Sequence, residues 1–283
     1  MAYPSTTWFI TGAARGIGAQ IVQAALAAGH NVVATARQRD SIHIAHDRLL
    51  ALDLDVTNVA QADAATQAAV ARFGRIDVLV NNAGYGQLGL FEESTAADAQ
   101  AQFATNVFGL LHVTRAVLPV MRQQRAGHVF NLSSIAGIRG IPGGTLYCAS
   151  KFAVEGFSEG LAQELAPFGI RVTIVEPGAF RTDFLDGQSM RFGSQPIADY
   201  AAQSAQISAG FGARNHLQPG DPARLAAVLL QLAAHPQPPL RFAAGSDAVA
   251  VIGAKIDALR GELEAWQRVS VTTDGSYEEN RGS

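Results

Sequence analysis

Short apolar runs recur along the chain, and most are followed by a longer stretch in which apolar residues return every three or four positions. Short runs of this kind are typical of buried β-strands, whereas the longer spacing predicts amphipathic helices. The runs predict strands at residues 7–11, 32–36, 50–54, 77–81, 128–133 and 171–176. Strands that alternate with crossover helices predict an α/β fold, a parallel doubly wound sheet in a single domain.

Turn and capping residues indicate where the helices between these strands begin and end. Helices are expected at residues 16–28, 57–74, 95–124 and 147–166. Thr57 is expected to cap an alanine-rich helix that stops at Gly74. Thr95 and Asp98 resemble a capping box. The polar segment 38–48 is long enough for a short helix. In such a fold, ligands bind beyond the carboxyl ends of the strands.

The regular alternation fails after Pro177 and resumes near Asp221. Residues 178–220 are therefore expected to form a long, partly apolar loop, which commonly serves as a lid over a binding site. The large apolar or aromatic residues of this lid include Phe180, Phe184, Leu185, Met190, Phe192 and Tyr200. The remaining expected elements are a strand at 240–244, a helix at 248–269 and a polar tail at 272–283, within one domain of residues 1–283.

The composition narrows the classes of partner. With 283 residues, 48% hydrophobic and 16% charged, the chain can bury a large core. A net charge of −3 with scattered basic residues argues against a nucleic-acid partner. Cys148 is the only cysteine, the first residues lack the pattern of a signal peptide, and no apolar run approaches the ~18 residues of a membrane span. We therefore expect a cytoplasmic protein with no membrane partner.

A glycine-rich turn lies between the first strand and the first helix. Residues 11–18 read TGAARGIG, and glycines here let the backbone turn tightly and approach a pyrophosphate at the helix N-terminus. The spacing differs from the GxGxxG of the usual dinucleotide fingerprint. Taken alone, this turn is as compatible with a purely structural role as with cofactor binding.

Tyr147 and Lys151 are four residues apart and share one face of the predicted helix. A neighbouring ammonium favours the phenolate of a tyrosine, whose ordinary pKa is near ~10, so Tyr147 can serve as an acid/base. Such a pair in isolation is more often part of a solvated helix face. Ser134 favours the catalytic interpretation because it ends a strand and can hydrogen-bond the same substrate oxygen, while strand alternation points Ser133 to the other face.

Five motifs follow one another along the first two-thirds of the chain: TGAARGIG, NNAG, a serine thirteen residues before a tyrosine, the YxxxK of that tyrosine, and Pro177-Gly178 followed by Thr182. In this combination, residues 8–182 closely resemble the short-chain dehydrogenase/reductase family. The resemblance implies an oxidoreductase that moves a hydride between a nicotinamide and a carbonyl or alcohol of a small molecule. The thirteen-residue offset selects Ser134 rather than Ser133.

The resemblance also implies which residues form the site. The catalytic tetrad would be Asn106, Ser134, Tyr147 and Lys151. Asn106 would kink its helix and hold a water linked to the lysine, whereas an asparagine inside a helix otherwise usually faces solvent. The implied cofactor-binding residues are Gly12, Arg15, Gly16, Ile17, Gly18, Arg37, Asp55, Val56, Asn82, Ala83, Gly84, Tyr147, Lys151, Pro177, Gly178 and Thr182.

Several of these residues have distinct roles in the family. Asp55 and Val56 are expected to flank the adenine ring. Asn82 is expected to support the central strand, and Gly84 to let the backbone approach the adenosine half. Thr182 is expected to contact the nicotinamide carboxamide.

The end of the second strand predicts NADP(H) rather than NAD(H). An acidic residue there binds the free 2′-hydroxyl of NAD, but this chain has Ala36 and Arg37. A guanidinium can pair with a 2′-phosphate, and the resemblance brings Arg15 to it from the other side. The alternative is that both are ordinary surface arginines.

Three further features predict the class of substrate and the oligomeric state. PGAFRTDF at residues 177–184 resembles the branch that includes 17β-hydroxysteroid and retinol dehydrogenases and their bacterial relatives. The apolar lid, with few charges, predicts a lipophilic substrate. By resemblance, the long helices starting near Thr95 and Tyr147 form subunit contacts, which implies a homodimer or homotetramer.

Other interpretations are weaker. A nucleotide-sensing regulator of the same fold typically lacks the tyrosine or lysine, and an epimerase has a differently spaced glycine turn and a larger C-terminal domain. His43 and His46 have no further partners for a metal set, so no metal is expected. Cys148 is expected to fill space in the helix.

Overall fold

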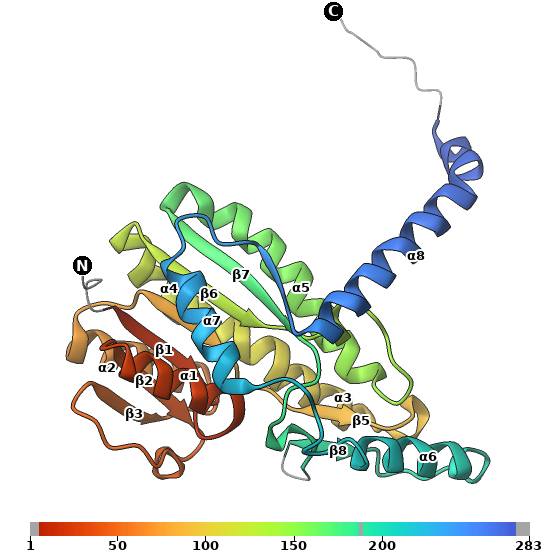
Figure 1. The fold of residues 1–283 in the computed structure, drawn as a ribbon, viewed down its shortest axis with the longest axis horizontal. Coiled ribbons are helices and arrows are strands. Elements are labelled where there is room, and N and C mark those ends of the chain that lie inside the picture. The colour runs from red at the N-terminus through yellow and green to blue at the C-terminus, as the bar shows by residue number, and fades with distance from the viewer. Residues whose placement is uncertain (1–5, 187–188, 276–283) are drawn as a thin grey trace, which may run out of the picture.

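The computed structural model describes residues 6–186 and 189–275. Its central sheet has seven parallel strands in the order β3-β2-β1-β4-β6-β7-β9 (Figure 1). These strands are β1 (Thr7–Thr11), β2 (Asn31–Ala36), β3 (Leu49–Asp53), β4 (Val78–Asn81), β6 (Gly127–Leu132), β7 (Ile170–Pro177) and β9 (Arg241–Ala244). The predicted doubly wound α/β fold is confirmed, because all predicted strands occur and pair in parallel.

Helices cover both faces of this sheet (Figure 1). One layer contains α1 (Gly16–Ala27) and α7 (Pro222–Ala234), and the other contains α2 (Val59–Phe73), α4 (Leu110–Gln124) and α5 (Thr145–Leu165). Strand alternation divides the core between the layers: Trp8 and Ile10 of β1 belong to the cluster with α1 and α7, and Phe9 between them belongs to the other. Burial on both faces explains why these strands are almost continuously apolar.

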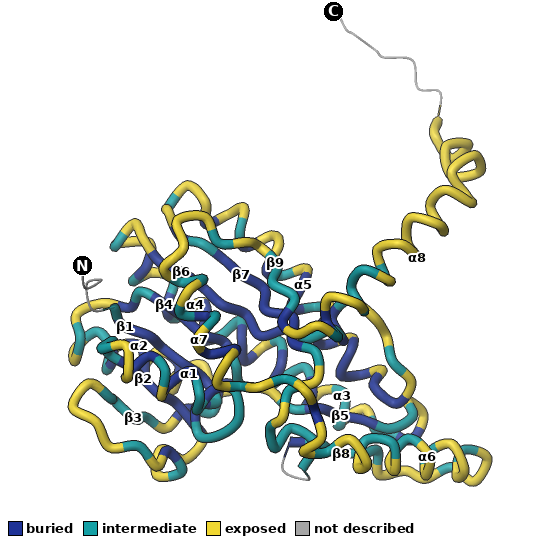
Figure 2. Tube along the Cα trace, in the orientation of Figure 1, coloured by how far each residue is buried: buried dark blue, intermediate teal, exposed yellow. Residues whose placement is uncertain are grey.

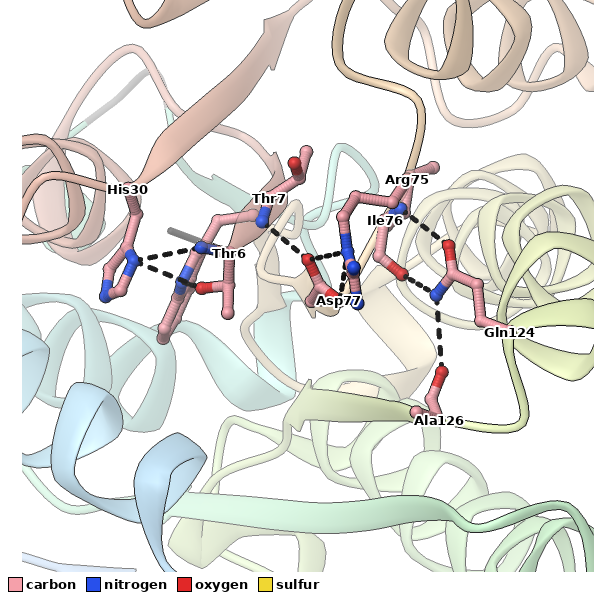
Figure 3. A network of polar contacts seen from close by, with 9 residues as sticks. Thr6, Thr7, His30, Arg75, Ile76, Asp77, Gln124 and Ala126 are labelled. Carbon is pink, nitrogen blue, oxygen red and sulfur yellow. Dashed lines mark hydrogen bonds and ion pairs between the residues drawn. The ribbon is translucent and has the colours of Figure 1, made fainter. Parts of the chain in front are cut away.

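A polar network fixes the amino ends of the central strands (Figure 3). Oδ2 of Asp77 accepts a hydrogen bond of 2.8 Å from the backbone N–H of Thr7, and the guanidinium of Arg75 donates to the same carboxylate. The side chain of Gln124 accepts from the N–H of Ile76 at 3.1 Å and donates to its carbonyl at 2.8 Å. The network therefore ties the amino ends of β1 and β4 to the C-terminal end of α4, on the side of the sheet opposite the strands' carboxyl ends.

The predicted capping box at Thr95 and Asp98 is present, and it starts α3 (Ala96–Phe103). The helical segment continues through a π-helical turn, Ala104–Gly109, into α4. By length and composition, Ala96–Gln124 could cross a membrane, although no uninterrupted apolar run was evident in the sequence. In this fold Val113, Val117 and Met121 of α4 are buried in the core against the sheet, so one face of the helix is a core face of the α/β protein.

Two local predictions were wrong. Asn58, not Thr57, caps α2: its side chain accepts a hydrogen bond from the N–H of Gln61, while the Thr57 hydroxyl donates to Asp55. The segment 38–48 contains only a short 3-10 turn at Arg39–Ser41, because it lacks the apolar periodicity that would hold a longer helix on the core.

The described parts of the lid segment, residues 178–186 and 189–220, contain more regular secondary structure than expected. They include α6 (Ala201–Gly212) and β8 (Met190–Phe192), and β8 pairs in parallel with β5 (Gly86–Leu88). The residues of α6 are mostly small, so its sequence has little apolar periodicity to reveal a helix. A contact between Phe180 and Gly220 closes the segment at its base.

The C-terminal helix α8 (Ser246–Ser270) extends away from the body of the molecule (Figure 1). It is exposed over most of its length (Figure 2). The expected last strand and C-terminal helix are thus confirmed. Of the expected polar tail, residues 272–275 follow the helix, and 276–283 lie outside the described residues.

We predict that Asp77→Asn lowers the free energy of unfolding by about 1–3 kcal/mol, because charged hydrogen bonds to Thr7 and Arg75 are weakened. Urea denaturation measures the change, with Asp63→Asn on the exposed side of α2 as the matched control. Equal stability of the two variants would contradict the structural role of the network.

Candidate active site

A cavity of about 1100 Å³ opens beyond the carboxyl ends of the strands, next to β1 and β4 where the strand order reverses. Most of the predicted site residues line it. They are Gly12, Arg15, Gly16, Ile17, Arg37, Asp55, Val56, Asn82, Ala83, Gly84, Ser134, Tyr147, Lys151, Pro177, Gly178 and Thr182. Gly18 and Asn106 do not line the cavity and instead support its walls.

The glycine turn is held tightly against the end of β4. Gly12 and Gly16 have φ values of +63° and +56°, a region that favours glycine. A Cβ at Gly18 would meet the carbonyl oxygen of Gly12, so a side chain there would push α1 away from the turn. The Asn82 side chain donates to the carbonyls of Thr11 at 2.9 Å and Gly12 at 3.0 Å. Asn82 thus braces the turn directly.

This turn fits the pyrophosphate of a dinucleotide. Helix α1 begins at Gly16, and the side chain of its N-cap residue Arg15 makes no capping hydrogen bond. Its first turn contains no acidic residue. The backbone N–H groups and the positive end of the helix dipole therefore face the cavity without a side-chain carboxylate among them.

Tyr147, Lys151 and Ser134 converge on one part of this cavity. The first two lie one turn apart near the start of α5. The ammonium of Lys151 donates to the carbonyl of Leu132 at 2.6 Å and lies 5.9 Å from the centroid of the Tyr147 ring. Ser134 follows the end of β6, where its hydroxyl accepts from the N–H of Ala136 at 3.1 Å. The three side chains form an arrangement suited to proton transfer at an oxygen.

Burial is the main cause of the pKa shifts of Tyr147 and Lys151. It raises the pKa of Tyr147 to about 12, while a hydrogen bond with Ser134 acts in the opposite direction. It lowers the pKa of Lys151 to about 8, against the negative charge of Glu155. Because each charged form loses hydration, Tyr147 needs positive charge beside it before it can ionise near neutral pH.

Asn106 lies in the π-helical turn and is buried, not solvent-facing. Its Oδ1 accepts from the N–H of Tyr85 at 3.1 Å, and its Nδ2 donates to the Tyr85 carbonyl at 2.9 Å and to the Ser150 hydroxyl at 3.2 Å. Asn106 therefore joins the loop between β4 and β5 to the residue preceding Lys151. The irregular turn at this position agrees with the expected kink.

A partly buried cluster of charged side chains, one helical turn beyond Lys151, was not foreseen. Arg241 Nη1 lies 2.7 Å from Glu155 Oε2 and 3.7 Å from Glu176 Oε1. Its Nη2 also pairs with Glu159 at 2.7 Å. Burial and the nearby charge of Glu155 raise the pKa of Glu176 to about 7, while Arg241 opposes the shift. Glu155 is one helical turn after Lys151, and that spacing was the available sequence signal.

The opposite end of the cavity is formed near β2. Arg37 lines this end of the cavity. Arg15 also lines the cavity, and its guanidinium donates a hydrogen bond to the hydroxyl of Ser189 in the lid. Asp53 lies beside Ala36 on the neighbouring strand, and its carboxylate accepts from the N–H of Arg39 at 2.6 Å. His43 and Ser41 also line this end and were missed by sequence reasoning.

The lid brings apolar groups onto Tyr147. The ring of Phe184 lies 5.6 Å from the Tyr147 ring, centroid to centroid. Met190, Phe192 and Phe211 pack on the same cluster. Cys148 is buried in it as a small filler, which confirms that expectation. The part of the cavity next to Tyr147 is thus flanked by an apolar cluster.

Two further groups were missed because their members are distant in sequence. Asp247, at the start of α8, accepts from the N–H of Ala179 at 2.7 Å and so holds the loop after β7. Asp183, Asp186 and His216 bring possible metal-ligand atoms within 4.8 Å of one another in the lid. Asp186 is already paired with His216 and accepts from Asn215, so internal partners account for its position.

Comparisons with known proteins agree with this geometry. Residues 6–190 match the family model described as short chain dehydrogenase. The chain is 38% identical over 273 residues to "Oxidoreductase BOA17" of Botryotinia fuckeliana, covering 94% of this chain and 98% of the relative. It is 39% identical over 236 residues to a "3-ketodihydrosphingosine reductase" of Bacteroides thetaiotaomicron, covering 83% and 86%. The chain belongs to the short-chain dehydrogenase/reductase family.

Solved structures extend the comparison to the cofactor. A short-chain dehydrogenase from Streptomyces avermitilis has 41% identity and a TM-score of 0.86, covering 95% of this chain and 100% of that one. A family member from Burkholderia phymatum in complex with NAD has 26% identity and a TM-score of 0.77, covering 94% and 96%. "ElxO with NADP Bound" has 28% identity and a TM-score of 0.66, covering 81% and 91%.

The protein is therefore an oxidoreductase that acts on CH–OH or C=O groups with a nicotinamide cofactor. This assignment favours the enzyme over the nucleotide-sensing regulator considered from the sequence. The sheet order, the glycine turn and the size of the cavity all fit a bound dinucleotide.

The raised pKa of Glu176 makes a prediction about stability. The native carboxyl keeps its proton up to about pH 7, whereas the unfolded one loses it near its ordinary value of 4.5. The contribution of Glu176 to the free energy of unfolding therefore falls as pH rises from about 4.5 to 7, by up to about 3 kcal/mol. The free energy of unfolding of the wild type, measured by denaturant titration relative to that of Glu176→Gln, should therefore be larger at pH 5 than at pH 8. Parallel pH profiles would contradict the prediction.

Proposed function

We propose that this protein is an NADP(H)-dependent reductase or dehydrogenase of lipophilic carbonyl compounds and secondary alcohols. The observation that carries the proposal is the convergence of Ser134, Tyr147 and Lys151 beneath an apolar lid whose Phe184 contacts the tyrosine ring. These three polar side chains thereby lie next to the apolar cluster of the lid, which suits a substrate with a reactive oxygen on an apolar body.

In the proposed reaction, Ser134 hydrogen-bonds the substrate oxygen and Tyr147 gives or takes its proton. The bound nicotinamide supplies or accepts the hydride. Lys151, held by the Leu132 carbonyl, provides positive charge that favours the phenolate. Asn106 acts on Lys151 indirectly through α5 and completes the catalytic tetrad.

The remaining predicted residues are proposed to hold the cofactor. Gly12, Gly16 and the start of α1 would receive the pyrophosphate. Asp55 and Val56 lie on the wall near β2 and would flank the adenine. Thr182 begins a turn beside Gly16 and would contact the carboxamide.

The choice of NADP(H) is supported by the charges near β2. Arg37 and Arg15 line the same cavity, while Asp53 is engaged by the backbone of Arg39. No acidic residue ends β2 itself, where Ala36 stands. A 2′-phosphate would meet guanidinium groups there, and Arg15 would exchange its Ser189 contact for it.

A lipophilic substrate is supported by two independent observations. The lid residues Phe184, Met190, Phe192 and Phe211 form one apolar cluster with Tyr147. The second observation is that a Bacteroides relative at 39% identity is named "3-ketodihydrosphingosine reductase". We further propose that the protein belongs to the branch that includes 17β-hydroxysteroid and retinol dehydrogenases, which residues 177–184 resemble.

A homo-oligomer is proposed from two exposed aromatic side chains on adjacent helices. Phe108 is 53% exposed and Phe152 is 46% exposed. They belong to the π-helical turn before α4 and to α5, the helices for which subunit contacts were expected. Large apolar side chains in this position would be covered by a second subunit.

Tyr147→Phe should lower kcat about 10²- to 10⁴-fold with aliphatic or aromatic ketones and NADPH, because only the transferable proton is removed. Cofactor affinity, measured by fluorescence titration of the same variant, should stay near that of wild type. Lipophilic ketones should be turned over in preference to anionic sugars or phosphorylated metabolites. Near-wild-type turnover by the variant, or a preference for anionic substrates, would overturn the proposal.

Wild type should prefer NADP(H), and Ala36→Asp combined with Arg37→Ala should shift the preference toward NAD(H). Loss of one charged hydrogen bond costs roughly 1.5–3 kcal/mol, which corresponds to about a tenfold to hundredfold or greater change in affinity. The measurement is kcat/KM with both cofactors, and Arg122→Ala on the outer side of α4 is the matched control. Equal or better use of NADH by the wild type would refute the assignment.

A further inference from the structure

Helix α8 is an arm rather than a covering layer. It has 25 residues, and within it Ala248 is the one buried residue. At 1.5 Å per residue it is roughly 37 Å long. Its base is fixed, because Asp247 accepts a hydrogen bond from Ala179 in the loop after β7. Figures 1 and 2 show the rest of the helix leaving the body and exposed.

An apolar stripe runs along this arm. Its residues are Val249, Ile252, Ile256, Leu259, Leu263 and Trp266, at alternating spacings of three and four. This is the a/d pattern of a coiled-coil seam. Val249, Leu263 and Trp266 are 61%, 67% and 65% exposed. A seam of this kind requires a helical partner, and the described part of the chain provides none.

We propose that α8 pairs with α8 of a second copy of this chain, in antiparallel orientation. In an antiparallel coiled coil, a positions face d positions. In one antiparallel register, every residue of the apolar stripe faces a stripe residue of the partner helix. Ile256 then faces Leu259 of the partner subunit, Ile252 faces Leu263 of the partner subunit, and Val249 faces Trp266 of the partner subunit. The two-fold axis passes between Asp257 and Ala258, so the pairing is self-complementary and closed.

The charges beside the seam distinguish the two possible orientations. In the antiparallel register, Lys255 lies beside Glu262 of the partner subunit, and the symmetric pair forms on the other side. In a parallel pair, Lys255 would instead lie beside Arg260 of the partner subunit, a like-charge contact. Parallel pairing would also stack the two Trp266 side chains on each other. Charge complementarity therefore favours the antiparallel dimer.

The same helix is poorly suited to a lipid surface. Its charged residues are Asp247, Lys255, Asp257, Arg260, Glu262, Glu264 and Arg268. These give four negative and three positive charges, whereas helices that lie on anionic membranes carry a basic surplus. A second protein helix with the same pattern matches both the stripe and the charges.

Sedimentation equilibrium of the full-length protein tests the contact. Leu259→Asp should halve the mass of the assembly or raise its dissociation constant at least tenfold, because the central layer of the seam is lost. Ala258→Asp introduces the same charge on the side away from the stripe and should leave the mass unchanged. Retained helicity and melting temperature in both variants separate this effect from misfolding. An unchanged mass for Leu259→Asp overturns the proposal.

Charge reversal at low salt tests the orientation. Lys255→Glu should weaken association severalfold, and combining it with Glu262→Lys should restore it. Stronger association of Lys255→Glu alone would indicate a parallel pair and overturn the antiparallel register. Flotation with phosphatidylglycerol vesicles covers the membrane alternative: vesicle binding lost in Leu259→Asp, with no change in mass, also overturns the proposal.

Discussion

The close approach of the glycine turn to the end of β4 is the constraint on which the site depends. Asn82 joins the carbonyls of Thr11 and Gly12 to β4, and Gly18 leaves room for α1 to lie directly behind the turn. These contacts aim the start of α1 into the cavity at the point where the sheet reverses its order. A side chain at Gly12 or Gly18 would separate α1 from β4 and open the wall that the cofactor requires.

The chemical end of the cavity depends on charge held in a buried place. Tyr147 and Lys151 are both desolvated, so each resists ionisation, and the Lys151 ammonium lies 5.9 Å from the centroid of the Tyr147 ring. Behind them, Arg241 holds Glu155 close enough to support the charge of Lys151. The polar network around Asp77 fixes β1 and β4 at their amino ends, on the opposite side of the sheet. Stability and chemistry are thus supplied at opposite ends of the sheet.

Apolar surface appears in two separate places with different physical consequences. Over Tyr147, the lid aromatics face inward and enclose space for a substrate. Along α8, the apolar stripe faces outward and is suited to another helix. Asp247 links the two regions, because it caps the loop after β7 from the base of the arm. Pairing of the arms would therefore fix the residue that holds one edge of the cavity.

Features that arise from local spacing could be predicted from the order of the amino acids. Strands that alternate with crossover helices predicted the parallel sheet. The thirteen-residue offset between Ser134 and Tyr147, together with the YxxxK spacing to Lys151, predicted three side chains that the fold brings to one cavity. Features that depend on partners distant in the chain emerged from the folded structure. Asn58 rather than Thr57 capped α2, α6 formed in the lid with little periodicity, and Arg241 gathered Glu155 and Glu176. Periodicity records which face of an element is buried, but the partner it is buried against is set by the three-dimensional packing of the whole chain.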